Sequence, residues 1–211
     1  MEVSVSILNS INRIKDVEKL NNTKCDYIHI DIMDGIFVDN KQFTISEVID
    51  IIKSSQKKID IHLMVNNPLE YIDKLKGYNI NNITFHEEIT QDKHKLIKIL
   101  KDNNIKVGIA LKPNTKIDSL IDYINDIDIV LIMSVEPGYG GQEFIESSLD
   151  KVRELKKIIN PTTKIEIDGG VKDININQIS TSGVDISVVG SFITKSDDFN
   201  RNIEIIKNPN K

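Results

Sequence analysis

The chain has 211 residues, of which 39% are hydrophobic and 28% are charged, as is ordinary for a folded globular protein. A formal net charge of −5 gives a nucleic-acid partner no electrostatic support, and no apolar run approaches the roughly 20 residues that cross a bilayer. The N-terminus does not resemble a signal peptide, and the single cysteine, Cys25, excludes an internal disulfide. We therefore expect a cytoplasmic protein of one domain, residues 1–211, in which Cys25 is a buried apolar residue.

Short runs rich in β-branched residues alternate with longer segments of helical periodicity along the whole chain. The expected strands are Val3–Leu8, Tyr27–Ile32, Ile59–Val65, Asn82–His86, Lys106–Leu111, Ile127–Met133, Lys164–Asp168 and Ile186–Gly190. The expected helices are Ile11–Leu20, Ile45–Lys53, Leu69–Leu75, Lys93–Lys101, Ile117–Ile124, Leu149–Ile158 and Asp198–Ile206. Strands that alternate with helices indicate a parallel sheet. Because no break in composition divides the repeated units, we expect closure into a single parallel (β/α)8 barrel of the TIM type.

Polar side chains stand at the ends of several expected strands, where such a barrel carries its catalytic groups. They are His29 and Asp31 on the second strand, His62 on the third, His86 on the fourth and Asp168 on the seventh. One histidine in such a place is more typical of a hydrogen-bonded structural residue. Unpaired carboxylates inside a barrel are costly to ionise, and histidine nitrogens and carboxylate oxygens are normal ligands of divalent cations. The sequence therefore predicts one metal ion bound by His29, Asp31, His62 and Asp168.

The ligand types do not select one metal. Mixed nitrogen and oxygen ligands suit several first-row ions, so Fe, Mn, Co and Zn all fit the expected site. Three methionines, Met33, Met64 and Met133, also lie at strand ends. Each alone is typical of barrel core, but together they indicate an apolar collar that excludes water from a reactive intermediate.

Glycine clusters follow the last three expected strands. They are Gly138, Gly140 and Gly141 around Tyr139, then Gly169-Gly170, then Gly190-Ser191. Each cluster alone is typical of a turn, but glycines let backbone N–H groups approach phosphate oxygens, and barrels bind phosphate with the loops after strands seven and eight. No nucleotide-binding motif of the GxGxxG or Walker type is present. Together the clusters predict a handle for the phosphate of a small molecule.

Several long motifs, in this order, resemble those of the ribulose-phosphate 3-epimerase family along nearly the full length of the chain. They are Ser6-Ile7-Leu8, HIDIMDGIFV (His29–Val38), DIHLMV (Asp60–Val65), MSVEPGYGGQ (Met133–Gln142), IEIDGGV (Ile165–Val171) and VVGS (Val188–Ser191). The resemblance implies 3-epimerisation of D-ribulose 5-phosphate to D-xylulose 5-phosphate in the pentose phosphate pathway. It further implies that Asp31 and Asp168 transfer protons as well as bind the metal, and that Ser6 and His62 contact the sugar. The glycine clusters, Ser191 included, would hold the phosphate.

These residue types suit inversion at a carbon next to a ketone. One carboxylate removes a proton from one face and a second returns a proton to the other face, exchanging roles in the reverse direction. A metal ion that bridges the carbonyl and hydroxyl oxygens stabilises the enediolate. The chain departs from the family at Val5, Asp39 and Lys112, where Pro, Pro and Asn are usual, and the segment Asp39–Ser46 matches poorly. These departures put substrate fine-tuning and subunit contacts in question, not the chemistry.

Other functions share parts of this pattern. A 3-epimerase of a ketohexose phosphate such as allulose 6-phosphate would have the same fold, metal and mechanism, although DGGV and GYGGQ are closer to the pentose enzyme. A non-catalytic sugar-phosphate-binding barrel would not need both carboxylates. Triosephosphate isomerase needs a lysine after the first strand, where this chain has Leu8-Asn9-Ser10, and orotidine-phosphate decarboxylase needs an Asp–Lys arrangement that is absent. The sequence leaves the oligomeric state open, a homo-oligomer included.

Overall fold

Strands and helices alternate along the chain in a computed structural model that describes residues 1–209. The strands are β1 (Glu2–Ser6), β2 (Tyr27–Asp34), β3 (Lys41–Gln42), β4 (Lys58–Met64), β5 (Asn82–His86), β6 (Lys106–Leu111), β7 (Ile129–Met133), β8 (Lys164–Asp168) and β9 (Ile186–Val189). The helices are α1 (Arg13–Asn21), α2 (Ile45–Ser54), α3 (Pro68–Leu75), α4 (Lys93–Asp102), the 3₁₀ turn η1 (Ile117–Leu120), α5 (Ser148–Leu155), α6 (Ile176–Ser182), α7 (Ser191–Thr194) and α8 (Phe199–Lys207).

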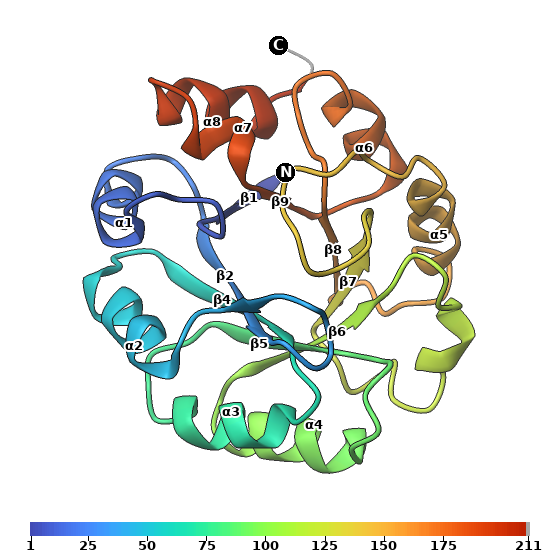
Figure 1. Ribbon diagram of the computed structural model, residues 1–211. Helices are drawn as coiled ribbons and strands as arrows, with labels where there is room; N and C mark the ends of the chain where they lie inside the picture. The colour runs from blue at the N-terminus through green and yellow to red at the C-terminus, as the bar shows by residue number, and fades with distance from the viewer. Residues whose placement is uncertain (210–211) are drawn as a thin grey trace.

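The strands close into a barrel with the helices outside it (Figure 1). The hydrogen-bonded order is β1-β9-β8-β7-β6-β5-β4-β2, and β2 pairs with β1 to close the ring. All of these pairings are parallel, whereas the short β3 adds antiparallel to the end of β2. The predicted (β/α)8 barrel is therefore confirmed. None of the helices within residues 1–209 is long and apolar enough to span a membrane.

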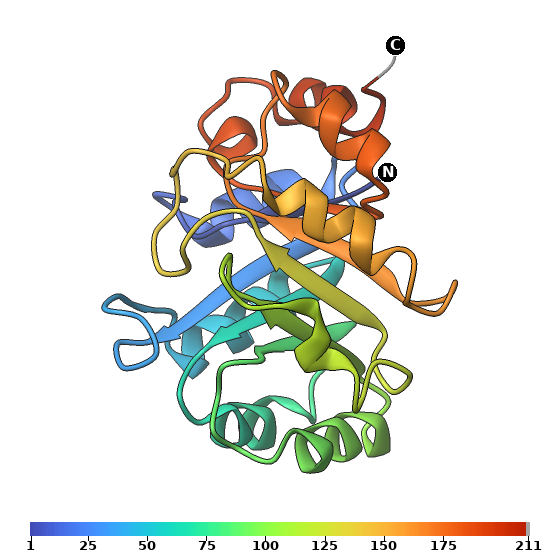
Figure 2. The same ribbon diagram turned by 90° about the vertical axis from the view of Figure 1, so that its right-hand side faces the viewer.

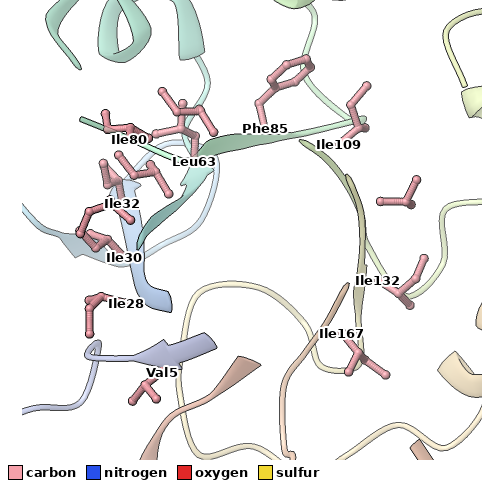
Figure 3. Packing of buried hydrophobic residues seen from close by; sticks show 14 of the residues in the cluster. Val5, Ile28, Ile30, Ile32, Leu63, Ile80, Phe85, Ile109, Ile132 and Ile167 are labelled. Carbon is pink, nitrogen blue, oxygen red and sulfur yellow. The ribbon is translucent and has the colours of Figure 1, made fainter. Parts of the chain in front are cut away.

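The apolar core lies between the barrel wall and the helices. Alternate residues of each strand point outward into it, as Figure 3 shows for Ile28, Ile30 and Ile32 of β2. Amphipathic helices cover this layer, and α2 begins with a capping box in which the Thr44 and Glu47 side chains satisfy each other's backbone N–H groups. The remaining strand residues point into the barrel. This interior is unusually polar for a fold whose centre is normally filled by branched apolar side chains, because it includes the buried residues Ser4, Asp60, Asn82, Thr84 and Glu166.

The expected helix Ile117–Ile124 does not form, so this prediction was wrong. Only the single 3₁₀ turn η1 forms, and turns follow it to residue 126. The apolar spacing is present, but Asp118 and Asp122 interrupt it, and such side chains favour turns over helix interiors. Two short helices, α6 and α7, were not expected at all. Asn, Ser and Thr dominate the sequence of α6, so its helical propensity is low.

Candidate active site

A pocket opens at the carboxyl end of the barrel, where the loops after β2 and β7 project side by side (Figure 2, blue and gold). It collects residues that the sequence analysis had placed at strand ends or in glycine loops. Its lining includes Ser6, Asp31, Met33, Met64, Met133, Gly138, Tyr139, Gly140, Gly141, Asp168, Gly169, Gly170, Gly190 and Ser191. Four polar residues of the lining were not predicted as site residues, namely Asn9, Glu136, Gln142 and Lys172. These residues lie within or beside the sequence motifs named above. The motifs did not show that their side chains line the pocket.

Four side chains converge at the base of this pocket. His29 Nε2 and His62 Nδ1 each lie 3.2 Å from Asp31 Oδ1. Asp168 Oδ2 lies 3.8 Å from His62 Nδ1 and 4.0 Å from His29 Nε2. One donor atom from each residue falls within 4.8 Å of all the others. Two ring nitrogens and two carboxylate oxygens at this separation fit one first-row divalent cation.

Strand register explains why these side chains meet. β2 and β4 pair in parallel, so that Asp31 lies opposite His62. His29 precedes Asp31 by two residues and therefore points to the same, inner side of the barrel. Asp168 ends β8, which is separated from β2 by β1 and β9. The two aspartates thus approach the site from strands that are not neighbours.

A buried carboxylate orients His29 from behind. Asp60 Oδ2 lies 2.6 Å from His29 Nδ1 and accepts a hydrogen bond from Ser4 Oγ, while Asn82 Nδ2 donates to Asp60 Oδ1. Donation from Nδ1 leaves Nε2 as the atom that faces Asp31. Asp60 was not among the predicted site residues. Its signal was the same two-residue alternation in β4, which puts Asp60 on the inner face with His62.

The electrostatics of this site favour a bound cation. Although burial favours the neutral ring, the Asp60 and Asp31 carboxylates raise the pKa of His29 well above its ordinary value. Burial likewise opposes ionisation of Asp31, but the charge of His29 and the hydrogen bonds from both histidines hold the pKa of Asp31 well below its usual range. Burial and the nearby Asp31 charge raise the pKa of Asp168 to about 6. The carboxylates thus favour the charged form of His29, and a divalent cation would supply positive charge at the same place.

The other predicted residues surround this cluster. Ser6 Oγ donates to Asp31 Oδ2 at 2.7 Å, so Ser6 also helps to orient a carboxylate. The methionines do not form one group: Met33 and Met64 pack with Val38, whereas Met133 belongs to a separate apolar cluster on the β7 side. All three are nevertheless buried and line the pocket.

Side-chain hydrogen bonds, one of them from the divergent segment, hold the loop after β7. Asn40 Nδ2 donates to Gly138 O at 2.9 Å, and Asn40 lies in the segment Asp39–Ser46 that matches the family poorly. Gln142 Nε2 donates to Glu136 O and Tyr139 O within the same loop. The divergent segment, which also forms β3, therefore supports from outside a loop that lines the pocket.

The backbone conformation of the loop after β8 requires glycine. Gly170 has a φ of 66°, and an added Cβ would lie 2.7 Å from Phe144 N. Gly141 has a φ of 83° but nothing within 4 Å of such a Cβ. We expect Gly141→Ala to cost about 1 kcal/mol of unfolding free energy, from the left-handed backbone alone. Gly170→Ala should cost about 3 kcal/mol, because a steric clash adds to that penalty.

Urea unfolding of the two variants beside the wild-type protein measures this difference. Equal destabilisation by Gly141→Ala and Gly170→Ala would show that crowding against Phe144 does not select glycine at position 170.

The barrel with a His/Asp cluster and glycine loops at its carboxyl end defines an enzyme of the TIM-barrel class. A model of the ribulose-phosphate 3-epimerase family matches residues 2–194, and the chain belongs to this family. It is 36% identical to a ribulose-phosphate 3-epimerase of Helicobacter pylori, across 99% of this chain and 97% of that protein. It is 39% identical to the Aquifex aeolicus protein of the same name, across 80% of this chain and 77% of the relative.

Solved structures show the same fold at lower identity. A mutant tryptophan synthase α-subunit from Pyrococcus furiosus superimposes with a TM-score of 0.75 at 16% identity, covering 98% of this chain and 97% of that one. A thiamine phosphate pyrophosphorylase from the same organism gives a TM-score of 0.67 at 12% identity, with coverages of 97% and 92%. At these identities the likeness concerns the barrel alone.

Proposed function

We propose that this protein catalyses the metal-dependent 3-epimerisation of D-ribulose 5-phosphate to D-xylulose 5-phosphate. The observation that carries the proposal is the convergence of His29, Asp31, His62 and Asp168 beneath a pocket walled by glycine loops. The curated relatives that share this chain's full length carry the name of this activity. The pathway this reaction serves is the pentose phosphate pathway.

His29 and His62 would hold the metal through one ring nitrogen each, and Asp31 and Asp168 through one carboxylate oxygen each. Fe, Mn, Co and Zn in the divalent state all accept such a donor set. When bound, the ion supplies electrostatic stabilisation of the negative charge that develops as carbon 3 loses its proton.

The two aspartates carry out the proton transfers. One carboxylate removes the proton from carbon 3, and the other returns a proton to the opposite face, so that the configuration inverts. Their origin on the non-adjacent strands β2 and β8 supports this assignment, because the two carboxyl groups approach the site from different parts of the barrel wall. In the reverse reaction the two groups exchange roles.

The remaining pocket residues bind and shield the substrate. Ser6 and His62 would contact the sugar hydroxyls, beside the carboxylates. Backbone N–H groups of the glycine loops would hold the phosphate, and the methionines would exclude water from the reacting carbon. The phosphate loops comprise Gly138, Tyr139, Gly140, Gly141, Gly169, Gly170, Gly190 and Ser191, and the shielding side chains are Met33, Met64 and Met133.

Rates on D-ribulose 5-phosphate and on D-allulose 6-phosphate, measured with the metal-loaded protein, test this assignment. We expect the pentulose phosphate to give the higher kcat/KM. A higher value on the hexulose phosphate would reassign the protein to ketohexose phosphates. Binding of both compounds without turnover of either would make it a sugar-phosphate-binding barrel.

A further inference from the structure

A line of three side chains leads away from the metal-ligand cluster on the side of His62. His62 Nε2 lies 2.9 Å from His86 Nε2, and His86 Nδ1 lies 3.0 Å from Glu88 Oε2. Both imidazoles are completely buried. The opposite nitrogen of His62, Nδ1, faces Asp31 at 3.2 Å. The position of every proton along this line therefore affects which atom of His62 can bind a metal.

Glu88 is fixed at the far end as a hydrogen-bond acceptor. Its Oε1 accepts from the Lys112 backbone N–H at 2.9 Å and from the Thr115 hydroxyl. Although burial opposes ionisation, hydrogen bonds from His86, Thr115 and Lys112 lower the pKa of Glu88 to about 2. Lys151 Nζ in turn donates to three carbonyls of the loop that presents these donors. The carboxylate is thus charged and held in place.

The anchored carboxylate determines which ring nitrogen carries the proton, first in His86 and then in His62. Glu88 can only accept, so His86 Nδ1 must donate to it. A neutral His86 then carries its lone pair on Nε2, which must accept from His62 Nε2–H. His62 is left with its lone pair on Nδ1, the nitrogen that faces Asp31 and Asp168.

We propose that Glu88 and His86 are positioning residues that hold His62 in the tautomer whose Nδ1 ligates the metal. The inference rests on the proposed function, since it requires His62 to be a ligand. The other histidine of the site supports it, because Asp60 accepts from His29 Nδ1 and leaves Nε2 toward the ligand cluster. Each metal-binding histidine thus has a carboxylate behind it, one in direct contact and one through a second ring.

Glu88→Gln tests the proposal because it preserves shape and reverses one hydrogen bond. The glutamine oxygen can keep both donors that Oε1 now accepts, which places the amide NH₂ where Oε2 now stands. That amide donates to His86 Nδ1, so His86 must carry its proton on Nε2 and donate to His62. The proton of His62 is then forced onto Nδ1, the nitrogen that faces the metal position.

We expect Glu88→Gln to lower the affinity for Zn(II) by about 10–100-fold, measured on the full chain by competition with a chromogenic chelator. Glu87→Gln is the matched control. Glu87 is the preceding residue, and its carboxylate contacts Tyr123 and Lys93 instead of the histidines. Its variant should bind Zn(II) like the wild-type protein. Equal Zn(II) affinities of the Glu88→Gln and wild-type proteins would overturn the inference.

Histidine ¹⁵N NMR of the Zn(II)-loaded wild-type protein gives a second readout that does not depend on the variant folding. We expect the proton of His86 on Nδ1 and that of His62 on Nε2. A wild-type His86 protonated on Nε2 alone would also overturn the inference. Failure of the wild-type protein to bind Zn(II), Mn(II), Co(II) or Fe(II) at all would instead contradict the proposed function, so the two failures are distinguishable.

Discussion

Replacing Asp168 by asparagine should lower kcat on D-ribulose 5-phosphate by about 10²–10⁴-fold, the usual contribution of one general acid–base group. The amide keeps the size of the side chain but cannot accept and return a proton. It also weakens the donor set, because Asp168 Oδ2 is one of the four atoms that converge on the predicted metal position. A coupled assay that detects D-xylulose 5-phosphate, at saturating metal, separates the loss of proton transfer from incomplete metal loading.

Asp150→Asn is the control for this experiment. Asp150 lies in α5, its side chain is 74% exposed, and its ion pair with Arg153 is also at the surface. The same chemical change there should leave kcat within a factor of two, since exposed ion pairs contribute about 0–1 kcal/mol to stability and nothing to the site. An Asp168→Asn protein that kept a tenth or more of the wild-type kcat would show that Asp168 does not transfer a proton.

Removing divalent metal from the wild-type protein should reduce activity at least about 100-fold, and Fe(II), Mn(II), Co(II) or Zn(II) should restore it. Mg(II) should restore little, because His29 and His62 supply nitrogen donors and Mg(II) prefers oxygen ligands. Metal should also stabilise the fold, by about 2.7 kcal/mol at a free concentration of 100 Kd.

Thermal unfolding with and without the ion provides a readout of binding that is independent of turnover. His62→Ala serves as the comparison, since it removes one donor atom and should abolish most of the metal-dependent rise in Tm. Full activity after exhaustive chelation, with no change in Tm on adding metal, would contradict metal dependence.

The barrel could be predicted from the sequence because the two-residue period of the strands and the 3.6-residue period of the helices are both strong. The alternation of side-chain direction within β2 predicts that His29 and Asp31 share one face. Because barrel sites lie at the carboxyl ends of strands, Asp168 is predicted at the same end of the barrel. The error at η1 has a local cause, since aspartates interrupt the helical pattern. The two-residue strand β3 is too short to have a periodicity of its own.

Two residues that were not predicted, Asp60 and Glu88, act through other side chains. Asp60 stands on the inner face of β4 like His62, but its role depends on the pairing of β4 with β2, which sets it opposite His29. Glu88 lies beyond the end of β5, and its importance arises from a ring–ring contact that no spacing reveals. Strand-end motifs thus identify the groups that face the pocket. The groups behind them depend on tertiary contacts.

The polar interior of the barrel belongs to the same arrangement. Glu166 precedes Asp168 by two residues on the inner face of β8 and lies beside Asp60 and His29. Burial and the Asp60 charge raise the pKa of Glu166 well above its ordinary value, which favours the neutral carboxyl group in this layer. A neutral Glu166 limits the cost of burying a polar layer directly beneath the ligand cluster.

Solvent hydrogen exchange at carbon 3 tests the central claim, proton transfer between Asp31, Asp168 and the substrate, most directly. Wild-type protein reconstituted with Fe(II), Mn(II), Co(II) or Zn(II) and incubated with D-ribulose 5-phosphate in D₂O should yield D-xylulose 5-phosphate labelled at carbon 3. The label arises because the proton that returns comes from a carboxylic acid in exchange with solvent. Epimerised product without deuterium at carbon 3, or no turnover with any of these metals, would contradict the account.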